Sequence, residues 1–280
     1  MDVRRERILL STQRSAALSL LALAAILGLR GAAPPPPAPT WSGEERLAVG
    51  GHRAFLIPAP RPPDRGPRPW VWYAPTLPNL PGGHENWLFT RLLAAGVSLA
   101  GIDVGESYGN AAGRAGFDRL HALLTARGYS PRPVLLGRSR GGLMLLSWAA
   151  EYPAHVAAFA GIYPVTNFAS YPGLERAAPA FGLTPAALAA ELPRHNPVDR
   201  LAPLAAARVP LLALHGDQDR LVPLAENSAL LHARYTALGG PMELLVVPGQ
   251  GHSLWAGFFE DPRVLDFLLH HALKAPIPAR

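Results

Sequence analysis

Short apolar runs alternate with amphipathic stretches along most of the chain. The apolar runs are four to eight residues long and cover residues 46–49, 53–57, 70–73, 97–104, 133–136, 156–162, 210–214 and 242–247. Runs of this length predict buried strands, and the first two flank Gly50-Gly51, which predicts a hairpin. Helical patterns lie at residues 85–95, 115–127, 141–152, 224–238 and 263–273. This alternation predicts an α/β fold: a mostly parallel, twisted sheet of about eight strands with helices on both faces.

Residues 165–208 depart from this pattern because they carry helical signals without a clear strand. Thr184 before Pro185, for example, predicts the start of a helix. Ligands bind at the carboxyl edge of open α/β sheets. We therefore expect a small cap-like insertion over that edge, within a domain that spans residues 45–275.

The N-terminal residues 1–33 are typical of an export signal. Arg4, Arg5, Arg7 and Arg14 precede an uncharged run over residues 15–29, which Arg-Gly-Ala-Ala closes. As a helix, this run would reach about 22 Å, short of the roughly 30 Å of a bilayer's hydrocarbon core. This length favours export to the periplasm or the medium over permanent membrane anchoring through residues 15–29. Anchoring and a cytoplasmic tail stay open as alternatives, and the Pro-rich residues 34–44 predict an extended linker.

Composition narrows the function classes. The net charge is +6, but only one of the 26 basic residues is a lysine, and the arginines beyond residue 14 are scattered rather than clustered. The charge therefore does not predict a nucleic-acid partner. The chain has no cysteine, which excludes thiol chemistry and disulfides. No residues have convincing metal-ligand spacing, so we expect neither a metal nor another cofactor.

The strongest chemical signal is a G-x-S-x-G sequence between an apolar strand and an apolar helix. It comprises Gly137-Arg138-Ser139-Arg140-Gly141. This context is that of a nucleophile elbow, in which glycines clear space around a strained turn and the serine lies at a helix N-terminus. A second match, Gly105 to Gly109, contains Ser107 but precedes a poor helix start. Its context favours Ser139 over Ser107 as the nucleophile.

A serine nucleophile needs a base and an acid. A strand that ends near His215 leads into a loop with Asp217 and Asp219, and the last strand leads into a glycine-flanked histidine, His252. The chain order of serine, acid and histidine is that of an α/β-hydrolase. In this scheme His252 accepts the proton of Ser139, and the carboxylate fixes the imidazole tautomer.

From about residue 70 to 272 the chain resembles the α/β-hydrolase superfamily, close to bacterial esterase-like and prolyl-oligopeptidase-like members. The pattern H-G-x-x-D-x-x-V-P in that resemblance implies Asp219 as the acid, with Asp217 as the alternative. It also implies the amide of Arg140 as one oxyanion donor. The familiar His-Gly-Gly is absent and Pro75 has no N–H, so Thr76 is the expected second donor.

Four further residues are candidates for substrate binding. Arg138 adjoins the nucleophile, Glu106 and Tyr108 follow a strand on the same edge, and Trp255 follows the histidine. They could bind an anionic or polyhydroxylated substrate. An ion pair between Arg138 and Glu106 that only shapes the pocket is the alternative.

Together these residues predict a serine hydrolase that forms an acyl-enzyme and acts on a small-molecule carboxylic ester. A prolyl-oligopeptidase-like peptidase would share the triad, although this chain leaves no room for the large propeller domain of full-length members. A catalytically silent binding protein with the same fold is the alternative from another class. The sequence leaves the oligomeric state open.

Overall fold

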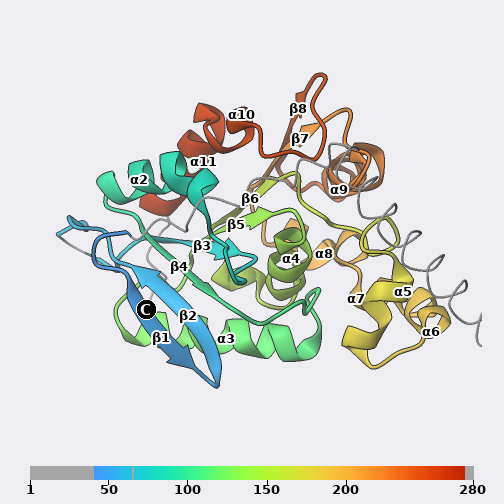
Figure 1. The fold of residues 1–280 in the computed structure, drawn as a ribbon, viewed down its shortest axis with the longest axis horizontal. Coiled ribbons are helices and arrows are strands. Elements are labelled where there is room, and N and C mark those ends of the chain that lie inside the picture. The colour runs from blue at the N-terminus through green and yellow to red at the C-terminus, as the bar shows by residue number, and fades with distance from the viewer. Residues whose placement is uncertain (1–40, 65, 275–280) are drawn as a thin grey trace, which may run out of the picture. The chain divides into compact units, whose positions relative to one another are not determined.

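The computed structural model describes residues 41–64 and 66–274, which are coloured in Figure 1. The predicted export signal and most of the predicted linker lie outside these residues. Within them, no helix has the length and apolar character that crossing a bilayer requires.

A single eight-stranded sheet organises the domain, in the order β1-β2-β4-β3-β5-β6-β7-β8. The first two strands form an antiparallel hairpin, and β2 also pairs antiparallel with β4. All other pairs are parallel, which confirms the predicted fold class. The strands are β1 (Glu45–Val49), β2 (His52–Ile57), β3 (Trp70–Ala74), β4 (Ser98–Ile102), β5 (Val134–Arg138), β6 (Ala158–Ile162), β7 (Leu211–Gly216) and β8 (Met242–Val247).

Helices pack on both faces of this sheet (Figure 1). One face is covered by α3 (Ala111–Ala126), α4 (Gly141–Glu151), α8 (Ala202–Ala206) and α9 (Ser228–Ala237). The other is covered by α2 (Asn86–Ala94), α10 (Ala256–Phe259) and α11 (Pro262–Lys274). The inner strands β3 to β7 are buried on both sides, as parallel strands between two helical layers require, whereas the edge strands β1 and β8 are partly exposed.

Two helix boundaries differ from the pattern-based expectation. Helix α3 begins at Ala111 rather than near residue 115, because the side chain of Asn110 accepts a hydrogen bond from the Gly113 amide and caps the helix. Residues 224–226 form a separate 3₁₀ turn, η5 (Leu224–Glu226), and α9 starts only at Ser228.

The predicted insertion consists of short helices only. Its helices are α5 (Leu174–Ala177), η3 (Ala178–Phe181), α6 (Pro185–Ala190), α7 (Leu192–His195), η4 (Pro197–Asp199) and α8, the last of which packs on the sheet. Thr184 caps α6 as expected, by accepting from the Ala187 amide. Two buried asparagines hold the insertion: Asn196 accepts from the Phe168 amide and Asn227 from the Thr166 amide.

Residues 41–44, the last four of the predicted linker, pack against the domain instead of forming a spacer. The Trp41 ring lies 5.2 Å from that of Phe89 on α2. The Glu44 amide donates to the Trp41 carbonyl, which makes a turn that leads into β1. The contact of Trp41 with Phe89 joins the segment before the first strand to α2.

A glycine at the end of β7 sets how closely two loops approach each other. A Cβ on Gly216 would overlap the carbonyl group of Gln250, which precedes His252. We predict that Gly216→Ala lowers the free energy of unfolding by about 1–3 kcal/mol, as overpacking does. Urea unfolding measures this, with Gly251→Ala as the control because its Cβ would meet only ordinary contacts. Equal stability of the two variants would contradict the prediction.

Candidate active site

Ser139 lies at a sharp turn between β5 and α4. Its φ of 49° is in the left-handed region, which costs energy for a residue with a side chain. A Cβ on Gly141 would overlap the carbonyl of Ala74, so only glycine allows α4 to approach the end of β3 this closely. The turn is held by the Ser139 amide, which donates to the Ile162 carbonyl on β6. These features are those of the predicted nucleophile elbow.

Three side chains from three strand ends form a continuous hydrogen-bonded chain. The Ser139 Oγ lies 3.0 Å from Nε2 of His252, and Nδ1 of His252 lies 2.7 Å from Oδ2 of Asp219. A carboxylate only accepts, so Nδ1 carries the proton and Nε2 is free to accept one from the serine hydroxyl. The arrangement can therefore deprotonate Ser139 when it attacks a carbonyl carbon.

The carboxylate of Asp219 is buried and has four donor groups around it. The amides of Leu221 and Val222 donate to Oδ1, at 3.0 and 2.8 Å. His252 donates to Oδ2, and Nε2 of His215 lies 3.2 Å from the same oxygen. Burial alone would raise the pKa of Asp219, but these hydrogen bonds outweigh it and hold the pKa well below its usual value. Asp219 is therefore ionised at neutral pH.

His215 is the residue of this site that sequence reasoning missed. It is fully buried at the end of β7, where its Nε2 also donates to the Val222 carbonyl and its Nδ1 contacts the Ser228 hydroxyl. The H-G-x-x-D pattern could have indicated this role, because the side chain of a histidine four residues before the acid can contact the carboxylate. His215 thus positions the acid without facing the nucleophile.

Ser107 and Asp217, the alternatives to Ser139 and Asp219, lie away from this chain of contacts. Ser107 is buried, and its hydroxyl accepts from the Gly109 amide just before α3 begins. Asp217 accepts from the Gly249 amide at 2.7 Å, which ties the β7 and β8 loops together at the surface. Within the part of the chain that the structure describes, neither side chain forms a hydrogen bond with His252.

A cavity of about 290 Å³ opens beside Ser139 and His252. The Tyr163 ring packs on the His252 imidazole with centroids 4.3 Å apart, and burial raises the pKa of Tyr163 to about 12, so its phenol stays neutral. The wall is formed by Pro75, Leu80, Arg138, Ser139, Arg140, Tyr163, Tyr171, Leu221, His252, Ser253 and Leu254. Tyr171 comes from the insertion, which therefore reaches the candidate site as expected.

Arg138 faces this cavity but is paired with Glu85, not with Glu106. Its Nη1 donates to Glu85 Oε1 at 2.7 Å, and its guanidinium lies over the Phe259 ring. Glu85 is buried and also accepts from the Tyr73 hydroxyl and the Gly82 amide. The expected alternative, an Arg138–Glu106 pair, is wrong because a buried carboxylate from the β3–α2 connection takes that place.

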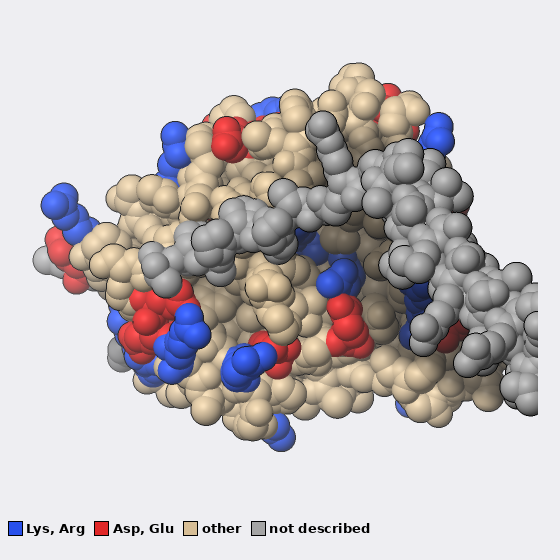
Figure 2. Space-filling view, in the orientation of Figure 1, with Lys and Arg blue, Asp and Glu red and all other residues tan. Residues whose placement is uncertain are grey.

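The remaining predicted substrate contacts lie at the periphery. Glu106 forms an ion pair with Arg140 at 3.0 Å. Tyr108 is half-buried, and burial together with Glu106 raises the pKa of its phenol. Glu106, Tyr108 and Trp255 are not on the cavity wall. On the face in Figure 2, basic and acidic side chains lie next to one another in and around the hollowed centre.

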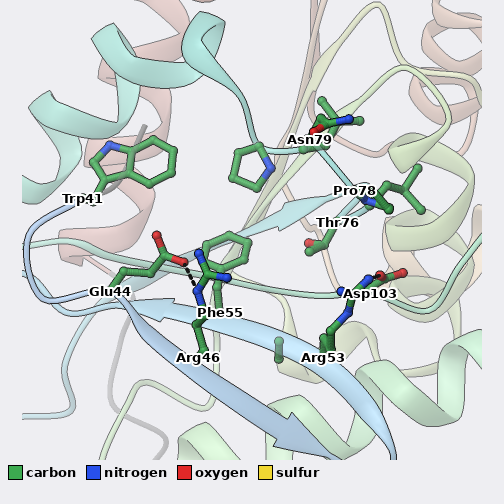
Figure 3. A pocket seen from close by; sticks show the side chains of 13 residues that line it. Trp41, Glu44, Arg46, Arg53, Phe55, Thr76, Pro78, Asn79 and Asp103 are labelled. Carbon is green, nitrogen blue, oxygen red and sulfur yellow. Dashed lines mark hydrogen bonds and ion pairs between the residues drawn. The ribbon is translucent and has the colours of Figure 1, made fainter. Parts of the chain in front are cut away.

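Thr76, the expected second oxyanion donor, does not line the cavity that contains Ser139 and His252. Its hydroxyl donates to the Tyr73 carbonyl and occupies the space that a side chain on Gly101 would fill, so Thr76 turns toward β4. It lines a neighbouring cavity of about 260 Å³ with Trp41, Phe55 and the ion pairs Glu44–Arg46 and Arg53–Asp103 (Figure 3). Pro75, which has no N–H, lines the candidate site instead.

Comparisons with known proteins agree with this geometry. The pattern of the prolyl oligopeptidase family matches residues 122–274, more than half of the chain. The chain belongs to the prolyl oligopeptidase family. It is a serine hydrolase with the α/β-hydrolase fold, as the resemblance implied. No curated protein sequence matches the chain.

Solved structures share the fold at low sequence identity. Est1E from Butyrivibrio proteoclasticus is 18% identical, with a TM-score of 0.63 over 83% of this chain and 100% of that one. An S-formylglutathione hydrolase from Agrobacterium tumefaciens is 17% identical, with a TM-score of 0.65 over 85% and 98%. A puromycin-hydrolyzing peptidase from Mycobacterium tuberculosis is 16% identical, with a TM-score of 0.64 over 81% of this chain. The chain spans only 39% of that peptidase's length.

The contacts of Asp219 generate a prediction about the acid. We expect Asp219→Asn to lower kcat for an activated ester by about 10⁴-fold, because an amide NH₂ facing Nδ1 stabilises the wrong histidine tautomer. Asp217→Asn keeps an acceptor for the Gly249 amide, and we expect it to stay within about tenfold of wild type. Steady-state kinetics of both variants measures this, and a larger loss in Asp217→Asn would reverse the assignment.

The buried position of Glu85 generates a second prediction. Glu85→Gln leaves the Arg138 guanidinium without its counter-charge, so we expect the free energy of unfolding to fall by about 3 kcal/mol. Glu106→Gln breaks an ion pair in a solvated position and should cost less than about 1 kcal/mol. Denaturant unfolding at neutral pH compares the two. A similar small cost for both would show that Glu85 and Arg138 are already well solvated.

Proposed function

We propose that this protein hydrolyses carboxylic esters through an acyl-enzyme on Ser139. The observation that carries the proposal is the chain of hydrogen bonds from Ser139 through His252 to Asp219, on the wall of an open cavity of about 290 Å³. A serine in this setting is activated for attack on an acyl carbon.

The steps follow from the positions of the proton and the charges. Nε2 of His252 takes the Ser139 proton as Oγ attacks the carbonyl carbon, and the Asp219 carboxylate stabilises the resulting imidazolium. The amide of Arg140, at the start of α4, is the proposed donor to the oxyanion. His252 then gives its proton to the departing alcohol, which leaves an ester between Ser139 and the acyl group. A water molecule, deprotonated by His252, attacks that ester and restores the free serine.

Two observations support an ester substrate over a peptide. The neighbours that this chain covers almost completely are Est1E and an S-formylglutathione hydrolase, whereas it covers 39% of the puromycin-hydrolyzing peptidase. The two arginines on the cavity wall are each already paired with a glutamate, so neither is free to anchor a peptide terminus. The family match keeps a peptidase as the second candidate.

Labelling with a fluorophosphonate probe tests the proposed nucleophile. We expect wild type and Ser107→Ala to be labelled and Ser139→Ala to lose labelling completely, because Ser139 contacts His252 at the cavity whereas Ser107 is buried against the Gly109 amide. Circular dichroism of each variant shows that the fold is retained. Absence of labelling in folded wild type would contradict the catalytic proposal and favour a silent binding protein.

Substrate class is then decided by comparing kcat/KM for p-nitrophenyl acetate with that for an aminoacyl-p-nitroanilide. We expect kcat/KM to be higher for the ester than for the anilide by at least about 10²-fold. Faster hydrolysis of the anilide would make the peptidase the better description.

A further inference from the structure

The wall of the catalytic cavity carries both charged and apolar side chains. Arg138 and Arg140 come from the elbow, where they flank Ser139. Leu221 comes from the loop of the acid and Leu254 from the loop of the histidine, and Pro75 and Leu80 add further apolar surface. These two leucines are 53% and 50% exposed, and Trp255, next to Leu254, is 44% exposed.

This apolar rim (Leu221, Leu254 and Trp255) is held by short local contacts. The Leu221 amide donates to Asp219, so the backbone of Leu221 is locked while its side chain points outward. The Trp255 ring packs edge-on against the buried Phe258. Large apolar side chains that stay exposed and grouped at a cavity mouth indicate a surface that a ligand covers.

The chemistry identifies which part of an ester this rim meets. His252 must give its proton to the leaving alcohol, so the alcohol oxygen lies within hydrogen-bond reach of Nε2. Leu254 follows His252 by two residues, and Leu221 follows Asp219 by two. Leu221 and Leu254 therefore line the cavity next in sequence to the two triad residues that handle the proton of the leaving group.

We propose that Leu221, Leu254 and Trp255 form a subsite for an apolar alcohol group of the ester. This inference rests on the proposed ester hydrolysis. At about 290 Å³ the cavity is at the lower end of ligand-site volumes, so an alkyl group longer than a few carbons must continue over the rim. The occupant is the alkyl chain of a single substrate molecule, and not a lipid surface.

Esters of one acid with different alcohols isolate this effect. Acetates of ethanol, butanol, hexanol and octanol all form the same acetyl-enzyme, and their alcohols have nearly equal acidity, so differences in kcat/KM report binding of the alcohol in the acylation step. A fully buried methylene contributes about fourfold. At a half-exposed rim, we expect kcat/KM to rise about twofold per methylene for wild type, with all esters kept monomeric.

Two exposed leucines elsewhere provide matched controls. Leu238 at the end of α9 is 50% exposed and Leu273 on α11 is 49% exposed, and neither lines the cavity. We expect Leu221→Ser and Leu254→Ser each to reduce the rise per methylene, and the double variant to abolish most of it. Leu238→Ser and Leu273→Ser should keep the wild-type rise. Ethyl esters of acetic to octanoic acid should show the same chain-length dependence in the rim variants as in wild type.

Each contrary result has a distinct meaning. An equal rise in the rim variants and wild type, or a flat series in wild type, would overturn the subsite. Loss of the acyl-chain dependence instead of the alcohol dependence would overturn its assignment to the leaving group. Activity that rises only when the ester forms micelles would show that the rim contacts an interface. Hydrolysis of none of the esters by a wild-type protein that still labels at Ser139 would overturn the ester hydrolase itself.

Discussion

The carboxylate of Asp219 is the point on which the active site depends. It joins three pieces of the chain: its own turn through the amides of Leu221 and Val222, the end of β7 through His215, and the β8 loop through His252. Burial of this carboxylate without hydrogen-bond donors would destabilise the folded state, because an unpaired charge loses its hydration. With them, it fixes the tautomer of His252 and the position of the loop that carries the apolar rim.

The charged side chains next to the nucleophile must also be paired. Two arginines flank Ser139, and each has its own glutamate partner. The buried Glu85 accepts from Arg138, Tyr73 and Gly82, so the charge of Arg138 is balanced where water is scarce. The two arginines on the cavity wall are therefore both balanced by carboxylates.

Much of this arrangement is predictable from the sequence because it depends on local patterns. Apolar runs predict all eight strands, and Ser139, Asp219 and His252 each follow one of them, so their placement at one sheet edge needs no contact information. Pairings that depend on packing between distant segments are not predictable in this way. Glu85 lies in a 3₁₀ turn without a motif, and nothing in its neighbours along the chain indicates that it meets Arg138. The contact of the Thr76 hydroxyl with Gly101 is not predictable from the sequence for the same reason.

The depressed pKa of Asp219 separates the roles of the two titratable groups in the triad. A carboxyl whose pKa is lower in the folded than in the unfolded state stabilises the fold above its unfolded pKa, near 4, and this contribution is lost as pH falls further. The carboxylate therefore remains ionised throughout the range in which a histidine titrates. A loss of turnover between about pH 5 and 7 therefore does not arise from protonation of Asp219, because the hydrogen bonds to its carboxylate keep it charged there.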